Sequence, residues 1–178
     1  MGELTEKIVH TERVFSGVLV KLDVHDVELP DGSMCKREVI QHPGASAVIA
    51  LDGDDVILVK QFRSASAQFM LELPAGVLEV DEAPEVCAIR ELQEEIGYKP
   101  GKLESIGGFY NAPGYTTEYI HLYIATNLIE SRLQGDIDEQ IEVVRLPLSE
   151  ALTMIENGTI ADSKTIIGLL RLARRLGV

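Results

Sequence analysis

An acidic cluster between Gly76 and Tyr98 holds the residues of this chain whose types and spacing are best suited to chemistry. Its seven defining positions are Gly76, Glu82, Arg90, Glu91, Glu94, Glu95 and Gly97. On a helix, Glu91 and Glu95 would lie one turn apart on one face, where like charges repel by roughly a few tenths of a kcal/mol. A hard divalent cation bound by carboxylate oxygens would offset that repulsion. The plainer alternative is a solvated acidic helix face, but at average residue usage all seven positions coincide by chance on the order of once in 10⁸ starts. We therefore predict a metal site.

A helix must position these groups, and both of its ends are visible in the sequence. Pro84 suits the first turn, where its missing N–H is not needed, and Gly97 suits the left-handed residue beyond the last turn. An apolar stripe at helical spacing is predicted between them, formed by Val86, Ile89, Leu92 and Ile96. The acidic residues are expected on the opposite side. We expect Arg90 to pair with Glu82 and Glu94 rather than to contact a substrate, because a guanidinium matches carboxylates bidentately.

The elements around this helix are mainly strands, because apolar and polar residues alternate with a period of two. Expected strands cover residues 18–24, 34–40, 47–51, 56–62, 69–73, 103–110, 119–125 and 141–146. Two further helices are expected, one over 149–156 that Asn157-Gly158 ends, and one that Ser163 caps and that runs to Leu176. This order predicts an α/β protein with a mixed sheet and an α/β/α sandwich, preceded by a small antiparallel β piece.

A break in the strand pattern at His42-Pro43-Gly44 predicts two regions. Residues 1–43 would form an N-terminal β-hairpin region, and residues 44–178 would form the larger domain that carries the acidic cluster. A chain of 178 residues with 46% hydrophobic residues can bury one substantial core.

The composition excludes several classes of protein. A net charge of −13 and a pI near 4.7 disfavour nucleic acid and anionic membranes as partners. Cys35 and Cys87 are too few for a disulfide framework, so we expect reduced thiols in a cytoplasmic protein. No apolar run approaches the roughly 18 residues of a transmembrane helix, and the polar start contains no signal-peptide core.

The acidic cluster resembles the Nudix box, the signature of hydrolases that cleave nucleoside diphosphates linked to another group. Further segments resemble the ADP-ribose pyrophosphatase branch of that family: VKQFR at 59–63, LELPAG at 71–76, a proline fifteen residues after Tyr98 (Pro113), and GDIDEQIEVVRLP at 135–147. The likeness runs from about Val14 to the C-terminal helix. It implies a Nudix-type α/β/α sandwich and hydrolysis of the pyrophosphate of ADP-ribose to AMP and ribose 5-phosphate.

Two alternatives accompany this resemblance. Relatives that cleave other nucleoside diphosphate sugars, such as GDP-mannose, share several of the motifs outside the box. A non-catalytic sensor of nucleotide sugars would keep the fold, but such a module typically has a degraded acidic helix, and here Glu91, Glu94 and Glu95 are all present.

The resemblance also implies a metal site and a general base. Glu91, Glu95 and the backbone carbonyl of Ala75 would bind Mg²⁺ or Mn²⁺, with two or more ions per site. Glu94 would be a further ligand or would orient one of the ligands. Glu82 would brace Arg90. Glu139 matches the general base of the branch, and its neighbours Asp136 and Asp138 are alternatives. A plain solvated acidic turn is the other interpretation of that loop.

The implied substrate contacts are fewer. Arg63 is the candidate to bind phosphate, against the alternative of a surface arginine on a strand. Glu118 matches a position that contacts metal or the terminal ribose in some relatives, or it is a surface charge, and Pro113 is assigned to the substrate pocket. The chain has no Trp to stack the base, which leaves the aromatic candidates Phe15, Tyr110 and Tyr115. In the branch, the N-terminal region packs between two subunits, so the resemblance implies a homodimer.

Overall fold

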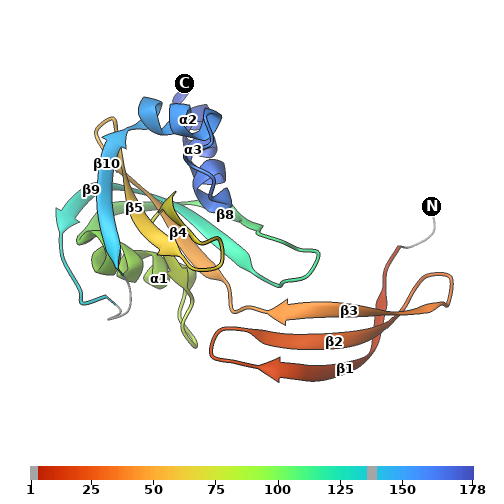
Figure 1. Ribbon diagram of the computed structural model, residues 1–178. Coiled ribbons are helices and arrows are strands. Elements are labelled where there is room, and N and C mark those ends of the chain that lie inside the picture. Colours follow the sequence, from red (N-terminus) through yellow and green to blue (C-terminus); the bar gives the residue numbers. More distant parts are fainter. Residues whose placement is uncertain (1–3, 136–139) are drawn as a thin grey trace. The chain divides into compact units, whose positions relative to one another are not determined.

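A computed structural model describes residues 4–135 and 140–178, which form two compact units (Figure 1). The first unit contains Met1–Gly44 together with Tyr110–Tyr119. The second contains Ala45–Phe109 and Ile120–Val178. No helix in the described part of the chain is both long and apolar enough to cross a bilayer.

The first unit is built on an antiparallel three-stranded sheet in the order β1-β2-β3. Its strands are β1 (Lys7–Ser16), β2 (Lys21–Glu28) and β3 (Met34–Gln41). The strand expected from residue 18 begins three residues later, because Gly17 to Val20 form a turn closed by a 2.8 Å hydrogen bond from the Gly17 N–H to the Val20 carbonyl. Strand β1 was not among the expected strands. Register shifts at Ile8/His10 and Arg13/Phe15 interrupt the period of two on which strand recognition depends.

The second unit contains a seven-stranded mixed sheet. Five strands follow the order β10-β5-β4-β9-β8, while β6 pairs with β5 and β7 pairs with β4. The strands are β4 (Ala45–Asp52), β5 (Asp55–Arg63), β6 (Gln68–Glu72), β7 (Ala75–Val77), β8 (Tyr98–Tyr110), β9 (Tyr119–Glu130) and β10 (Ile141–Pro147). Strands β4 and β9 run parallel, whereas β5 is antiparallel to both β4 and β10. Only the three-residue β7 was missed, because it is too short to show any period.

In the described part of the chain three α-helices accompany this sheet, and the first, α1 (Pro84–Glu91), carries Arg90 and Glu91 of the acidic cluster. It continues directly into a π-helical turn, η1 (Leu92–Ile96), and ends at Gly97, whose φ of 77° is the expected left-handed conformation. The C-terminal helices are α2 (Leu148–Glu156) and α3 (Ser163–Leu176). The predicted cap of α3 is wrong by one residue. Asp162 is the cap, because its carboxylate accepts a hydrogen bond from the Thr165 N–H, and a carboxylate serves the exposed first amides well.

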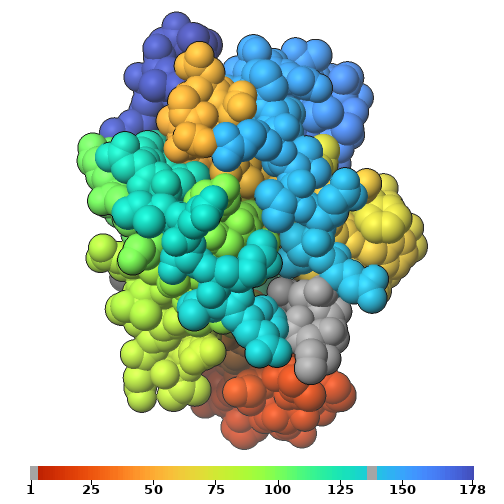
Figure 2. All heavy atoms as spheres, turned by 90° about the vertical axis from the view of Figure 1, so that its left-hand side faces the viewer, coloured from red at the N-terminus to blue at the C-terminus, as the bar shows by residue number. Residues whose placement is uncertain are grey.

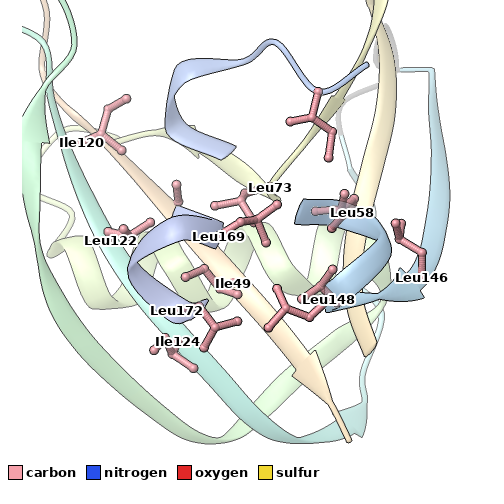
Figure 3. Packing of buried hydrophobic residues seen from close by; sticks show 14 of the residues in the cluster. Ile49, Leu58, Leu73, Ile120, Leu122, Ile124, Leu146, Leu148, Leu169 and Leu172 are labelled. Atoms are coloured by element: carbon pink, nitrogen blue, oxygen red, sulfur yellow. The ribbon is translucent and has the colours of Figure 1, made fainter. Parts of the chain in front are cut away.

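The core has two layers, one on each face of β4. Ile49 packs with Leu148, Leu169 and Leu172 of α2 and α3 (Figure 3). On the opposite face, β4 packs against α1 and η1, which together form the box helix (84–96). This second cluster includes Val48 and Ala50 of β4 and Ala88, Leu92 and Ile96 of the box helix. Strand β4 is therefore buried on both faces, and the expected α/β/α sandwich with a mixed sheet is confirmed.

The chain that follows β9 lies against the end of the box helix (cyan against yellow-green in Figure 2). The Ser131 N–H donates to the Gly97 carbonyl at 2.9 Å, and the Leu133 N–H donates to the Gln93 carbonyl at 3.2 Å. These bonds satisfy carbonyls of the last turn that have no partner within the helix. The box helix is therefore held at its C-terminal end as well as along its buried face.

Candidate active site

Strand β7 and helix α1 meet at Gly76 and Glu91. A Cβ atom built on Gly76 would lie 1.8 Å from Oε1 of Glu91 and 2.1 Å from its Cδ. A side chain at position 76 would therefore displace the Glu91 carboxylate, and glycine lets that carboxylate lie against the backbone of β7. The preceding residue of β7 contacts a second carboxylate: the Ala75 N–H donates to Oε2 of Glu95 at 3.0 Å. The short strand thus places backbone groups beside two acidic side chains.

Arg90 joins the carboxylates of the cluster. Its Nε and Nη2 donate to the two oxygens of Glu82, both at 2.9 Å. Its Nη1 donates to Oε1 of Glu91 at 2.6 Å and to Oε2 of Glu94 at 3.0 Å. The expected pairs with Glu82 and Glu94 are present, and the contact with Glu91 is an addition. The hydrogen bonds from Arg90 lower the pKa of Glu82 to about 2, so this carboxylate is ionised at neutral pH.

The two acidic residues at helical spacing are unusually buried. Glu91 is 7% exposed and Glu95 is 8% exposed. Four carboxylates, those of Glu82, Glu91, Glu94 and Glu95, lie in this cluster with the guanidinium of Arg90. Carboxylate oxygens gathered in one place suit a bound divalent cation.

One expectation about this helix is wrong. The predicted apolar stripe included Val86, which is 56% exposed, while Cys87 and Ala88 are buried instead. The face of α1 that packs against β7 accounts for this, because Cys87 lies there with its Sγ 3.5 Å from the Gly76 carbonyl oxygen.

The side chains of the cluster supply oxygen donors, which suit Mg²⁺ and similar hard cations. Within residues 4–135 and 140–178, no three Asp, Glu, His or Cys side chains already converge as a metal-binding group. In this structure Arg90 occupies one oxygen each of Glu91 and Glu94. Cys87 adds no thiolate ligand at neutral pH, because burial raises the pKa of its thiol to about 11.

Arg63 lies at the end of β5 and is paired with an acidic residue that the sequence had not singled out. Its Nε and Nη2 donate to the two oxygens of Glu72, at 2.7 and 2.8 Å. Glu72 is 1% exposed and also accepts a hydrogen bond from Lys164. The signal that could have revealed Glu72 is an acidic residue placed between Leu71 and Leu73 in an apolar strand, which requires a buried partner.

Two of the other predicted substrate-binding residues, Pro113 and Glu118, belong to the first unit. There Oε2 of Glu118 accepts a hydrogen bond from Nδ2 of Asn111 at 2.8 Å, and Nε2 of His42 lies 3.7 Å from Oε1. The predicted base Glu139 and its alternatives Asp136 and Asp138 lie outside the described residues. The structure therefore brings together Ala75, Glu82, Arg90, Glu91, Glu94 and Glu95 in one cluster.

Comparison with known proteins places this geometry in context. The model of the NUDIX domain matches residues 40–167. An ADP-ribose pyrophosphatase of Bacillus subtilis is 44% identical over 168 residues, which are 93% of this chain and 91% of that protein. A methanol dehydrogenase activator of Bacillus methanolicus is 44% identical over 173 residues, covering 95% of this chain and 94% of that protein.

Two further matches are informative. A GDP-mannose pyrophosphatase of Cronobacter sakazakii is 38% identical over 164 residues, or 85% of each chain. Among solved structures, an ADP compounds hydrolase superposes with a TM-score of 0.90 over 99% of this chain and 97% of its own, at 22% sequence identity. At that identity the similarity establishes the fold alone.

Proposed function

This chain belongs to the NUDIX family, and from that premise we propose that it is a hydrolase that cleaves the pyrophosphate of ADP-ribose to AMP and ribose 5-phosphate. The observation that carries the proposal is the 44% identity to an ADP-ribose pyrophosphatase over nearly the whole of both chains. In the reaction, the oxygen of a water molecule forms a bond to one phosphorus. The bond between that same phosphorus and the bridging oxygen breaks, and the bridging oxygen leaves with the other phosphate. The leaving phosphate keeps the electron pair of that bond, and the proton of the water passes to a base.

We assign the metal site to Glu91, Glu95, Glu94 and the backbone carbonyl of Ala75. Support comes from the buried carboxylates and from the Gly76 position, where the absence of a Cβ lets the backbone of β7 lie against Glu91. Mg²⁺ or Mn²⁺ bound here, as two or more ions, would neutralise the diphosphate and activate water. Arg90 orients Glu91 and Glu94 through its Nη1, and Glu82 holds the opposite edge of the guanidinium.

Glu139 is our proposed general base, with its sequence neighbours Asp136 and Asp138 as the alternatives. A carboxylate in this role must reach the attacking water directly or through one further water. Arg63 is proposed to bind the diphosphate, because a guanidinium offers planar paired hydrogen bonds to phosphate oxygens. Pro113 and Glu118 are proposed to contact the sugar end of the substrate.

A specific observation supports a second substrate class, since a GDP-mannose pyrophosphatase is 38% identical over 85% of this chain. A panel of ADP-ribose, GDP-mannose, ADP-glucose and NADH, with purified protein and Mg²⁺, tests both substrates by the release of phosphatase-sensitive product. We expect the highest kcat/KM for ADP-ribose. A preference for GDP-mannose would retain the box chemistry and overturn the substrate assignment. Tight binding without turnover would favour a sensor.

The relative from Bacillus methanolicus is as similar as the Bacillus subtilis enzyme, and its name refers to activation of a methanol dehydrogenase. The same purified protein can be added to a methanol dehydrogenase assay, with and without ADP-ribose as a competitor. Activation that ADP-ribose suppresses would indicate that one site serves both activities.

We also propose a homodimer in the cytoplasm. The dimer is supported by the resemblance to the pyrophosphatase branch and by exposed apolar side chains on β1, among them Ile8, Val9 and Phe15. Symmetric dimers are the commonest soluble oligomers. The cytoplasmic location is supported by Cys35 and Cys87, which the structure leaves as free thiols.

A further inference from the structure

Glu72 is a buried carboxylate at the end of β6 that connects three elements of the second unit. Its side chain is 2% exposed. Arg63, at the end of β5, donates to both of its oxygens. Lys164, in the first turn of α3, donates to Oε2 and also lies 3.1 Å from Oδ1 of Asp162, the cap of the same helix. One acidic side chain therefore connects both strands of the β5–β6 hairpin to the start of α3.

A second set of bonds holds the same place. The Leu73 N–H donates to Oγ1 of Thr165 at 2.8 Å, and that hydroxyl donates to Oδ2 of Asp162 at 2.6 Å. Leu73 itself packs in the core beside Leu169 of α3 (Figure 3). The backbone at Glu72 is thus fixed by packing and by hydrogen bonds, so its carboxylate has a defined position.

Stability alone does not account for this arrangement. A buried ion pair contributes little net stability compared with apolar residues of the same volume. Lys164 also lies in the first turn of its helix, where the helix dipole disfavours a positive charge. A sequence that keeps two such unfavourable choices at one place indicates a functional requirement there.

The group that reaches the surface from this network is Arg63, whose side chain is 44% exposed. Because the guanidinium uses its Nε and Nη2 edge to bind Glu72, its Nη1 end points away from that carboxylate. Arg63 also lies within electrostatic reach of the box helix. Its pKa is raised chiefly by the hydrogen bonds with Glu72, and the charge of Glu95 adds to the effect.

We propose that Glu72, held in place by Lys164, is a positioning residue that fixes the guanidinium of Arg63 for contact with the diphosphate of the substrate. The inference rests on the proposed pyrophosphatase activity. A flexible arginine must lose the freedom of its side-chain torsions when it binds phosphate. The bidentate bond to Glu72 restricts those torsions in advance, so less affinity is lost on binding.

A double-mutant cycle on the full chain tests this proposal. KM, kcat and melting temperature are measured for the wild type, Arg63→Ala, Glu72→Gln and the double variant, and for Lys164→Met as a milder disruption. The substrate is ADP-ribose, or whichever member of the panel the wild type turns over best. Failure of the proposed substrate is therefore detected before any variant is compared. Glu142→Gln is the matched control, because Glu142 of β10 forms an exposed ion pair with Lys60, which lies on β5 as Arg63 does.

We expect Glu72→Gln to raise KM about tenfold, the size of one lost charged hydrogen bond, with a smaller change in kcat. In the Arg63→Ala background the same substitution should change KM less than twofold, because its effect passes through Arg63. Lys164→Met should raise KM in the same direction, and Glu142→Gln should leave it unchanged. Equal effects of Glu72→Gln in both backgrounds would assign Glu72 a structural role and overturn the proposal. An unchanged KM in Arg63→Ala would overturn it as well.

Discussion

At the residue scale, the contact between Gly76 and Glu91 explains a glycine whose role is not conformational. The distance from a hypothetical Cβ to Oε1 of Glu91 is 1.8 Å, well inside any real contact. The acidic side chain therefore occupies the volume that any other residue at position 76 would need. The carboxylate keeps this position beside β7 because residue 76 has no side chain.

Gly76→Ala should consequently disturb the site more than the fold. The added methyl group must displace the Glu91 carboxylate from β7, and we expect turnover with Mg²⁺ to fall by about 10–100-fold, the range seen when groups that orient metal ligands are altered. The metal concentration at half-maximal activity should rise in parallel. Val80→Ala is a suitable control, since Val80 lies in the same box segment and is 93% exposed. Normal metal dependence in Gly76→Ala would contradict this explanation.

Glu95→Gln tests the metal assignment itself. The substitution preserves the shape of the side chain, and its remaining carbonyl oxygen can still accept from the Ala75 N–H, but it removes one negative charge. We expect kcat to fall by about a hundredfold or more, because metal charge stabilisation amounts to several kcal/mol. Circular dichroism should show an unchanged fold. Wild-type turnover in this variant would end the assignment of Glu95 as a ligand.

Glu139→Gln addresses the general base. A positioned base contributes typically about 10²–10⁴-fold to the rate, so kcat should fall by an amount in this range while KM changes little. Asp136→Asn and Asp138→Asn, at neighbouring positions in the sequence, serve as matched controls. If one of these variants loses turnover instead, the base role belongs to that aspartate.

At the scale of elements, the β5–β6 hairpin and helix α3 are joined by an ion pair whose strength depends on pH. Burial alone would raise the pKa of Glu72, but the hydrogen bonds and charges of Arg63 and Lys164 lower it to about 2, compared with 4.5 in an unfolded chain. A lowered folded pKa stabilises the protein above the unfolded pKa. That stabilisation is lost as the pH falls from about 4.5 to about 2.

Urea unfolding between pH 6 and pH 3 should reveal this contribution. The wild-type free energy of unfolding is expected to fall through that range, and the Glu72 share of the loss is on the order of 2 kcal/mol, out of the roughly 3 kcal/mol that its full protonation would remove. Glu72→Gln should be less stable at pH 6 by a similar amount, and its stability should change less as the pH falls. The two curves should therefore approach each other at low pH. Parallel curves would show that Glu72 does not titrate with the lowered pKa.

The same elements show what sequence could and could not predict. Most strands, their turns and both ends of the box helix follow from local patterns, because alternation, Pro84 and Gly97 act over a few residues. Strand β1 was missed because bulges break its alternation. The partnership of Glu72 with Lys164 joins positions 92 residues apart, and no local pattern encodes it. The acidic cluster was visible as a set, but the burial of Glu91 and Glu95 depends on β7 and on the π-helical turn.

At the scale of the whole molecule, charge and substrate appear opposed. The chain carries a net charge of −13, and a nucleoside diphosphate sugar is itself an anion. Divalent cations at the proposed metal site would reverse the field locally, and Arg63 and Arg90 add positive charge in the same unit. The remaining acidic surface repels anions. At 0.1 M salt this repulsion is screened beyond about 10 Å. Attraction of substrate is therefore a property of the site and not of the molecule.

In the first unit, every residue of β1 is exposed in a single chain, which favours self-association through this strand. Native mass spectrometry should give twice the 19.5 kDa chain mass at micromolar concentration. Phe15→Lys, which places a charge on a side chain that is 56% exposed, should shift the protein toward monomer and lower turnover if the dimer completes the site. Leu170→Lys, at a 47% exposed position of α3, should do neither. A wild-type monomer with full turnover would show that this unit has a purpose other than self-association, because its apolar side chains would then be exposed in the working enzyme.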